Sequence, residues 1–207
     1  MLDSLLRPLI DPPLNRVAKS LSDQGFMANR ITWIGFILGL AGCVCAGFQA
    51  YIPAMILILL SRGLDILDGA VARAGGRVTE WGAYLDITLD FVIYAAFPVF
   101  FILGQPDHAL AAAFLLFSYI GTASTFLAFA IIAAKRGLTT TERGEKSFYH
   151  QGGIVGATET VLFIIVCCLY PEAFSAFAVI FGLLCGMTAL QRFMHAKRVF
   201  GMLPKTS

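Results

Sequence analysis

Six apolar runs, each about as long as a helix that crosses a lipid bilayer, constrain this chain more than any other feature. A hydrocarbon core about 30 Å thick requires roughly 20 apolar residues in a helix. Hydrophobic residues make up 58% of the chain and charged residues only 14%, which excludes an ordinary soluble protein. We therefore expect an all-α membrane protein with six transmembrane helices, at about residues 31–49, 51–72, 82–104, 108–134, 153–170 and 172–194.

The segment before the first run has a different pattern. Residues 2–21 place leucines at helical spacing with Arg16 and Lys19 between them, which is typical of an amphipathic helix lying on a membrane. Because Pro12 and Pro13 cannot continue a helix from the preceding turn, we expect two short interfacial pieces. The predicted organisation is an interfacial segment at 1–28, a six-helix domain at 29–195 and a tail at 196–207.

The fifteen lysines and arginines sort to one side of this layout. They lie before the first run, toward and within the second-to-third connection (Arg62, Arg73 and Arg77), between the fourth and fifth runs (residues 135–153), and at the end of the last run and beyond it, while the other connections contain none. Basic connections stay in the cytoplasm. We therefore expect a multi-pass protein of a bacterial inner membrane, with both termini and the second-to-third connection in the cytoplasm.

Four aspartates flank that second-to-third connection. Asp65 and Asp68 stand three residues apart and Asp86 and Asp90 four apart, so each pair lies on one face of a helix. Four like charges in a medium of low dielectric constant repel one another unless cations lie between them. Carboxylates without a neighbouring His or Cys suit Mg²⁺ or Mn²⁺, and two such ions can hold a phosphoryl group.

Small residues and one arginine accompany these acids. Gly69 and Gly82 leave little side-chain bulk beside the predicted metal face, so a ligand can approach the backbone there. Arg73 provides a planar guanidinium that suits phosphate oxygens.

With its gaps, the stretch reads D-x2-D-G-x2-A-R-x8-G-x3-D-x3-D, and it resembles the signature of the CDP-alcohol phosphotransferase family. The resemblance covers every fixed position of that signature. These are Asp65, Asp68, Gly69, Ala72, Arg73, Gly82, Asp86 and Asp90. It implies transfer of a phosphoalcohol group from a CDP-alcohol, often CDP-diacylglycerol, to a hydroxyl acceptor with release of CMP.

The resemblance also implies roles for individual residues. Asp65, Asp68 and Asp86 would bind two Mg²⁺ or Mn²⁺ ions, and Asp90 would act as the base and contact the second ion. The CDP pocket would consist of Gly69, Ala72, Arg73 and Gly82. Asn29 and Thr32 either form the N-cap and first turn of the first span or contact the nucleotide, as residues of these types do in the family.

Three further residues are candidates for an acceptor pocket. Glu159 falls inside the fifth span, where an acid requires a partner, so it either shapes the acceptor pocket, pairs with a buried cation such as Arg62, or serves packing. Lys135 and Arg136 are available for a phosphorylated acceptor.

Two G-x-x-x-G pairs, Gly35 with Gly39 and Gly182 with Gly186, indicate close helix packing within the chain or, alternatively, a subunit interface. We expect a homodimer.

Two rival functions stay open at this point. One is a CDP-choline or CDP-ethanolamine enzyme in which diacylglycerol is the acceptor. The other is a cation transporter that uses intramembrane acids, although Asp107 and Glu172 are the only charges in the predicted outer connections. Without a basic run or a zinc spacing, we expect no nucleic-acid partner.

Overall fold

The computed structural model describes residues 2–137 and 153–201. Most of the connection at 135–153 and the end of the predicted tail at 196–207 lie outside these residues. Within them the chain is helical and contains no strand. The helices are α1 (Leu2–Asp23), α2 (Ala28–Gly47), α3 (Tyr51–Ala74), α4 (Glu80–Gly104), α5 (Ala109–Lys135), α6 (Ala157–Leu169) and α7 (Phe174–Gly201), with 3₁₀ turns at Pro106–His108 and Pro171–Ala173.

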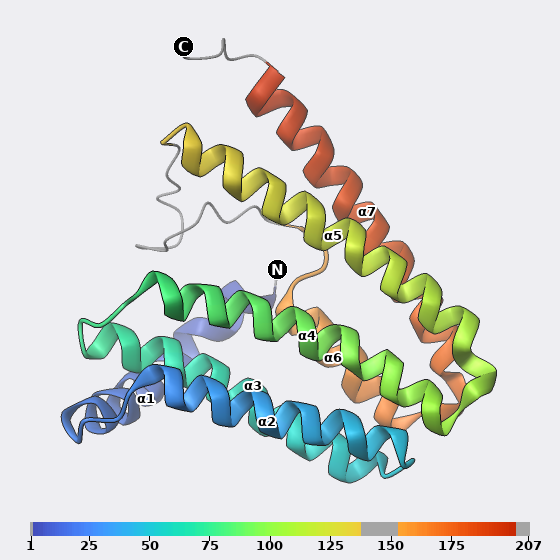
Figure 1. The fold of residues 1–207 in the computed structure, drawn as a ribbon, viewed down its shortest axis with the longest axis horizontal. Helices are drawn as coiled ribbons and strands as arrows, with labels where there is room; N and C mark the ends of the chain where they lie inside the picture. The colour runs from blue at the N-terminus through green and yellow to red at the C-terminus, as the bar shows by residue number, and fades with distance from the viewer. Residues whose placement is uncertain (1, 138–152, 202–207) are drawn as a thin grey trace.

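Helices α2 to α7 follow the six apolar runs closely (Figure 1). Among the described residues, α2, α4, α5 and α7 are long and apolar enough to cross a membrane. Charged residues interrupt the apolar sequence of α3, and α6 has only 13 residues. At its C-terminal end α7 continues to Gly201, beyond the predicted end of the last span at residue 194.

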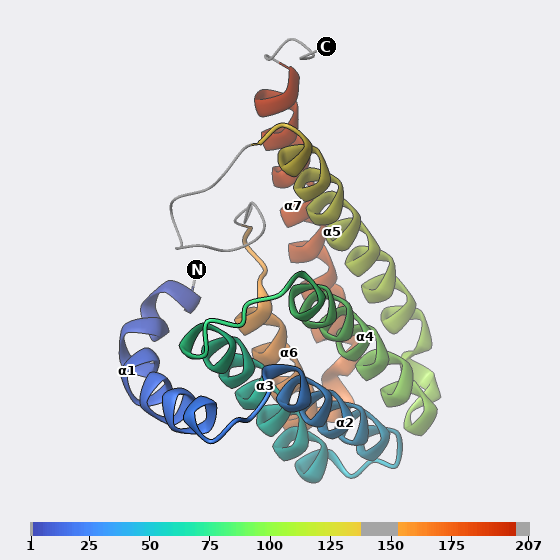
Figure 2. The same cartoon turned by 60° about the vertical axis from the view of Figure 1, so that its left-hand side comes forward.

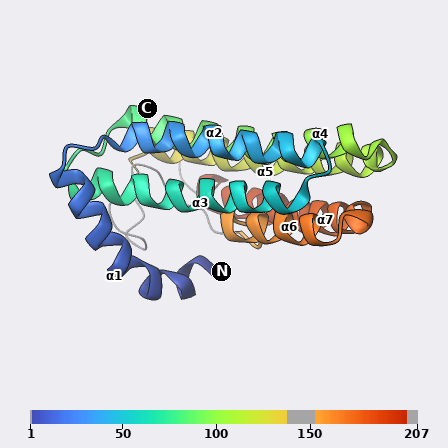
Figure 3. The ribbon, with the colours of Figure 1, turned by 90° about the horizontal axis from the view of Figure 1, so that it is seen from below.

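The predicted break in the N-terminal segment is wrong. Helix α1 runs without interruption through Pro12 and Pro13, and Figures 2 and 3 show it as a curved helix. A proline removes one helical hydrogen bond and bends the helix, but the flanking turns can still continue. Leu14, Ala18 and Leu21 of α1 belong to an apolar cluster that includes Ala70 and Val71 of α3.

Helices α2, α3 and α4 form a closely packed group because α2 presents glycines to its neighbours. A Cβ atom added at Gly39 would lie 2.7 Å from both Ile93 Cδ1 and Ser61 Oγ, and one at Gly42 would lie 2.7 Å from Ile58 Cγ1. The prediction that Gly35 and Gly39 serve close packing within the chain is therefore confirmed, since Gly35 also lies against α3.

The two glycines of the second G-x-x-x-G pair, Gly182 and Gly186, differ in their surroundings. A Cβ atom at Gly182 would lie 2.7 Å from Phe114 Cε1, so this glycine allows α7 to pack closely along α5. Gly186 has no atom within 4 Å of the added Cβ position among the described residues. Figures 1 and 2 show α5 and α7 side by side, diverging from α2, α3 and α4 toward their C-terminal ends.

Three short joins, those between α2 and α3, α4 and α5, and α6 and α7, meet at one end of the molecule. The amide of Gln49 donates to the carbonyl oxygen of Gly104 at 2.6 Å, and that of Gln105 donates to the Tyr51 hydroxyl at 2.8 Å. His108 Nδ1 lies 2.7 Å from Ser175 Oγ. The C-terminal end of α3 and the N-terminal end of α4, with the four aspartates, therefore lie toward the opposite end.

Candidate active site

The four motif aspartates come together between α3 and α4. Asp65 and Asp68 lie on α3, and Asp86 and Asp90 lie on α4. Asp65 is close enough to interact electrostatically with each of the other three. Asp68 is buried, Asp65 and Asp90 are partly buried, and Asp86 is exposed. The helices thus gather four acids from two short segments into one cluster that extends from the surface into the helix bundle.

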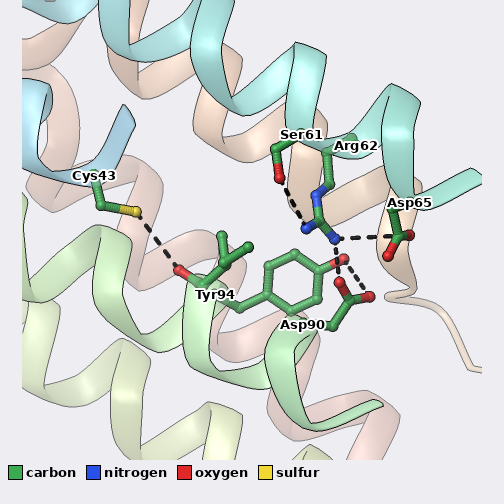
Figure 4. A network of polar contacts seen from close by, with 7 residues as sticks. Cys43, Ser61, Arg62, Asp65, Asp90 and Tyr94 are labelled. Carbon is green, nitrogen blue, oxygen red and sulfur yellow. Dashed lines mark hydrogen bonds and ion pairs between the residues drawn. The ribbon is translucent and has the colours of Figure 1, made fainter. Parts of the chain in front are cut away.

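A buried arginine lies inside this cluster, only 8% exposed (Figure 4). Arg62 Nη1 donates to Asp90 Oδ1 and lies 3.8 Å from Asp65 Oδ2, while Nη2 donates to Ser61 Oγ at 3.2 Å. The Tyr94 hydroxyl donates to Asp90 Oδ2 at 3.4 Å, and the guanidinium carbon lies 5.6 Å from the Tyr94 ring centroid. Both carboxylate oxygens of Asp90 therefore accept hydrogen bonds from neighbouring side chains.

Sequence reasoning missed this arrangement. It treated Arg62 as one of the cytoplasmic cations and as a possible partner of Glu159, and it gave Tyr94 no role. The signal was present in the spacing, because Arg62 precedes Asp65 by three residues and Tyr94 follows Asp90 by four. Residues at these separations share a helix face.

The ligand set fits a divalent cation in its chemistry. All four acids offer carboxylate oxygens, and Asp68 Oδ2 is buried without a hydrogen-bond partner. Such an oxygen is costly to leave unpaired, which favours a cation beside it. As the side chains stand, no three His, Cys, Asp or Glu residues among those described converge closely enough to hold a metal ion. Asp65 and Asp90 are instead directed to Arg62.

Two glycines near the acids, Gly69 and Gly82, each lie close to a polar side chain. A Cβ atom at Gly69 would lie 3.2 Å from Arg73 Nη1, so the guanidinium of Arg73 lies over Gly69. A Cβ atom at Gly82 would lie 3.3 Å from Asn29 Oδ1. Ala72, on the same helix as Gly69, is half-buried. The residues predicted for the CDP pocket therefore lie on the segments that carry the acids.

Helix α2 contributes two of these predicted nucleotide residues. The N-cap of α2 is Met27, without a side-chain cap, so the alternative of Asn29 as the N-cap is wrong. The Asn29 side chain lies against Gly82 of α4 instead, because Asn29 falls inside the first turn of α2 and points toward α4. The Thr32 hydroxyl donates to the Ala28 carbonyl oxygen at 3.2 Å and also interacts with the Asp68 carboxylate.

A small cavity lies where α2, α3 and α4 meet. Its lining includes Thr32, Arg62, Asp65 and Asp90, together with apolar residues such as Phe36 and Ile93. Arg62, Asp65 and Asp90 of the network in Figure 4 therefore line a partly enclosed cavity beside apolar side chains, where electrostatic interactions are stronger than in water.

The three acceptor candidates lie on other helices. Glu159 Oε2 accepts a hydrogen bond from the Gly156 amide at 3.0 Å, which closes the first turn of α6. Lys135 and Arg136 lie at the C-terminal end of α5, where the Arg136 guanidinium carbon is 5.2 Å from the Phe200 ring centroid of α7. The hydrogen bond from the Gly156 amide gives Glu159 a role in the fold. The proposed acceptor role of Glu159, Lys135 and Arg136 stays a prediction.

Fold and site together define a helical membrane protein with an acidic cluster inside its helix bundle. Residues 26–196 match the CDP-alcohol phosphatidyltransferase family, and the chain belongs to this family. It is therefore a transferase of substituted phosphate groups that acts in phospholipid biosynthesis at a membrane.

The chain is also similar to individual proteins along part or most of its length. The chain is 44% identical over 193 residues to the Escherichia coli K12 inner membrane protein YnjF, with 93% of each chain covered. It is 40% identical over 87 residues to the archaetidylinositol phosphate synthase of Pyrococcus horikoshii, with 42% of this chain and 46% of that protein covered.

Solved structures show the same fold. The phosphatidylinositol phosphate synthase PgsA1 of Mycobacterium tuberculosis with bound CDP-DAG superposes with a TM-score of 0.70 at 20% identity, over 89% of this chain and 93% of the other. Its complex with manganese and citrate gives a TM-score of 0.68, also at 20% identity, over 87% of each chain.

Proposed function

We propose that this enzyme transfers a phosphatidyl group from CDP-diacylglycerol to a hydroxyl acceptor and releases CMP. The observation that carries the proposal is the gathering of Asp65, Asp68, Asp86 and Asp90 from two helices, beside glycines that leave the backbone accessible. Relatives named as inositol phosphate lipid synthases and a structural neighbour with bound CDP-DAG support a lipid on the CDP side. The family assignment favours this reaction over the cation-transporter alternative.

In this reaction the acceptor hydroxyl oxygen attacks the phosphorus atom that carries the diacylglycerol. A new P–O bond forms, the P–O bond to the bridging oxygen of the pyrophosphate breaks, and CMP leaves with that bond's electron pair. Asp90 takes the proton of the hydroxyl group. Asp90 suits this role because it lines the small cavity between α2, α3 and α4.

Asp65, Asp68, Asp86 and Asp90 would hold two Mg²⁺ or Mn²⁺ ions. When bound, such ions neutralise the charge of the pyrophosphate and of the departing CMP. Support comes from the oxygen-only ligand set, from the unpaired buried oxygen Asp68 Oδ2, and from the manganese complex of the structural neighbour.

The nucleotide would lie along the backbone of Gly69 and Gly82, with Arg73 directed to phosphate oxygens. Asn29 and Thr32 of α2, together with Ala72, would complete this pocket. Glu159, Lys135 and Arg136 are proposed for the acceptor side, where the two cations would suit a phosphorylated acceptor.

Helices α2 to α7 would all cross a bacterial inner membrane, with the acid cluster and both termini in the cytoplasm and α1 on the cytoplasmic surface. The one-sided distribution of basic residues supports this orientation, and the inner membrane protein YnjF supports the location. We further propose that the protein forms a homodimer.

The orientation is tested with single cysteines in a background that lacks the native ones. Asp107 and Val78 lie at opposite ends of α4 and both are exposed. An impermeant thiol reagent applied to intact cells should label Asp107→Cys and leave Val78→Cys unlabelled until the cells are opened. The reverse pattern would contradict the orientation.

The reaction is tested by giving the purified protein CDP-diacylglycerol, Mg²⁺ or Mn²⁺, and a panel of acceptors that includes serine, glycerol phosphate and inositol phosphate. We expect CMP release together with a new phospholipid for one class of acceptor. A parallel assay with CDP-choline and diacylglycerol provides the comparison. Product formation only in that assay would show that the lipid is the acceptor and not part of the CDP-alcohol.

A further inference from the structure

Arg62 is the feature of the site that the family motif does not account for. It is buried on α3, and its Nη1 atom makes ion pairs with Asp90 of α4 and with Asp65 of α3. A buried charge of this kind contributes little net stability, because removing it from water costs about as much as the pair returns. Its position between two motif acids therefore calls for a functional explanation.

The two acids paired with Arg62 are also two of the proposed metal ligands. Asp90 Oδ1 accepts a hydrogen bond from Arg62 Nη1, and Asp65 Oδ2 lies 3.8 Å from the same nitrogen. A divalent cation would use these carboxylate oxygens, and one oxygen cannot serve both the guanidinium and a cation at full strength. Asp68 differs from this pair, because its Oδ2 atom is buried and has no hydrogen-bond partner. The cluster is therefore asymmetric, because Asp68 has an unpaired oxygen open to a cation whereas Asp65 and Asp90 share the single positive charge of Arg62.

The structure also holds Arg62 in place by contacts that do not involve the acids. Its Nη2 atom donates to Ser61 Oγ, and its guanidinium carbon lies over the Tyr94 ring at 5.6 Å. The close approach of Gly39 to Ser61 Oγ fixes that hydroxyl between α2 and α3. Arg62 can therefore release a carboxylate without leaving the site.

We propose that Arg62 is an internal counter-ion that competes with a divalent cation for Asp65 and Asp90, and so sets how tightly the second ion binds. The inference rests on the proposed function for the presence of a divalent cation. It predicts sequential loading, with a first ion bound chiefly through Asp68 and Asp86 and a weaker second ion that must displace the guanidinium.

The test measures Mn²⁺ binding rather than turnover. Purified protein is stripped with a chelator and titrated with Mn²⁺, and the electron paramagnetic resonance signal of free Mn²⁺ gives the number of ions bound and their affinities. The variant Arg62→Gln should bind the weaker ion about tenfold more tightly or better, because a unit positive charge beside its ligands is gone. Unchanged or weaker binding in Arg62→Gln would overturn the proposal.

Two controls separate competition from a general effect of charge or packing. Arg62→Lys keeps the charge, so its weaker site should stay close to that of the wild type. Arg77→Gln removes an equal charge from an exposed position at the same end of the protein, and its Mn²⁺ affinities should change by less than about twofold. Tightening of similar size in either control would contradict the competition.

If Arg62→Gln does not fold, the same competition is measured at Asp65 alone. Asp90→Asn and the double variant Asp90→Asn, Arg62→Gln differ by the guanidinium, and neither leaves Asp90 charged and unpaired. The double variant should bind Mn²⁺ more tightly than Asp90→Asn, and equal affinity would overturn the proposal.

The variant Asp68→Asn distinguishes failure of the proposed metal site from failure of the proposed competition by Arg62. Mn²⁺ binding that is insensitive to Asp68→Asn contradicts the proposed metal site, whereas sensitivity there with no effect of Arg62 contradicts the competition only.

Discussion

The two ends of the α3–α4 pair are packed in opposite ways. Near the short joins, Phe101 stacks on Phe174 of α7 with ring centroids 4.2 Å apart, and Phe97 is fully buried beside them. At the other end, the same two helices place Arg62 and Asp90 against one another with further acids around them. We refer to these as the aromatic end and the acid end.

This difference indicates that the aromatic end stabilises the fold and that the acid end serves binding and catalysis. Aromatic rings at the first end bury large apolar areas and join α4 to α6 and α7. The acid end gathers like charges that oppose folding and are retained for binding and catalysis. Substitutions at the aromatic end should therefore change stability with little effect on turnover, and those at the acid end should do the reverse.

A loss of turnover by orders of magnitude is expected for Asp90→Asn at the acid end. The change keeps the size of the side chain and removes the proposed base, so turnover with CDP-diacylglycerol should fall by about 10²- to 10⁴-fold. CDP-diacylglycerol binding, measured on the same preparation, should change only slightly. If Asp90→Asn loses nucleotide binding as severely as Asp65→Asn does, Asp90 is principally a metal ligand and Glu159 is the next candidate for the base.

Phe174→Ala should have the largest effect on stability. The ring is fully buried against Phe101 and Phe163, so its loss should lower the free energy of unfolding by about 3–5 kcal/mol. Turnover per folded molecule should stay near that of the wild type. Leu110→Ala is the matched control, because Leu110 lies near the same end and is 85% exposed. Denaturation in detergent should show a much smaller change for this control.

Adding a methyl group at two glycines should give effects of opposite sign. Gly42→Ala forces a Cβ atom to within 3.0 Å of the Ala54 carbonyl oxygen, and we expect a loss of about 1–3 kcal/mol from the overpacked α2–α3 contact. Gly186→Ala meets open space in the described part of the chain and should be neutral or stabilise α7 by up to about 1 kcal/mol. Thermal unfolding of the two variants checks this, and equal destabilisation would contradict close packing as the cause.

Much of the fold could be predicted because the order of apolar and charged residues along the sequence marks where each membrane helix begins and ends. The ends of α3 and α4 fall within two residues of the predicted spans, since polar residues bound both runs. The course of α1 could not be predicted, because local proline sterics bend a helix without deciding whether it continues. The pairing of α7 with α5 depends on how Phe114 fits against Gly182, a contact between residues distant in sequence.

The site was predictable to the extent that its residues lie in one short motif. The spacing of Asp65, Asp68, Asp86 and Asp90 indicates two helix faces, and the structure brings these faces together. The role of Arg62 depends on the orientation of one long side chain between two helices, which spacing alone does not determine. Asn29 approaches Gly82 because α2 packs beside α4, a relation that lies outside the motif.

The central claim is that the acid end carries a divalent-cation-dependent transfer of the phosphatidyl group. The most direct test measures CMP release from CDP-diacylglycerol in the presence of an acceptor from the panel that supports turnover. It compares the wild type, Asp68→Asn and Asp107→Asn, each with Mn²⁺ and with a chelator. CMP release should require the ion, fall by about 10³-fold or more in Asp68→Asn, and stay unchanged in Asp107→Asn at the aromatic end. Thermal unfolding of Asp68→Asn should occur no lower than that of the wild type. Release by Asp68→Asn at a rate near that of the wild type, or undiminished release with the chelator, would contradict the claim.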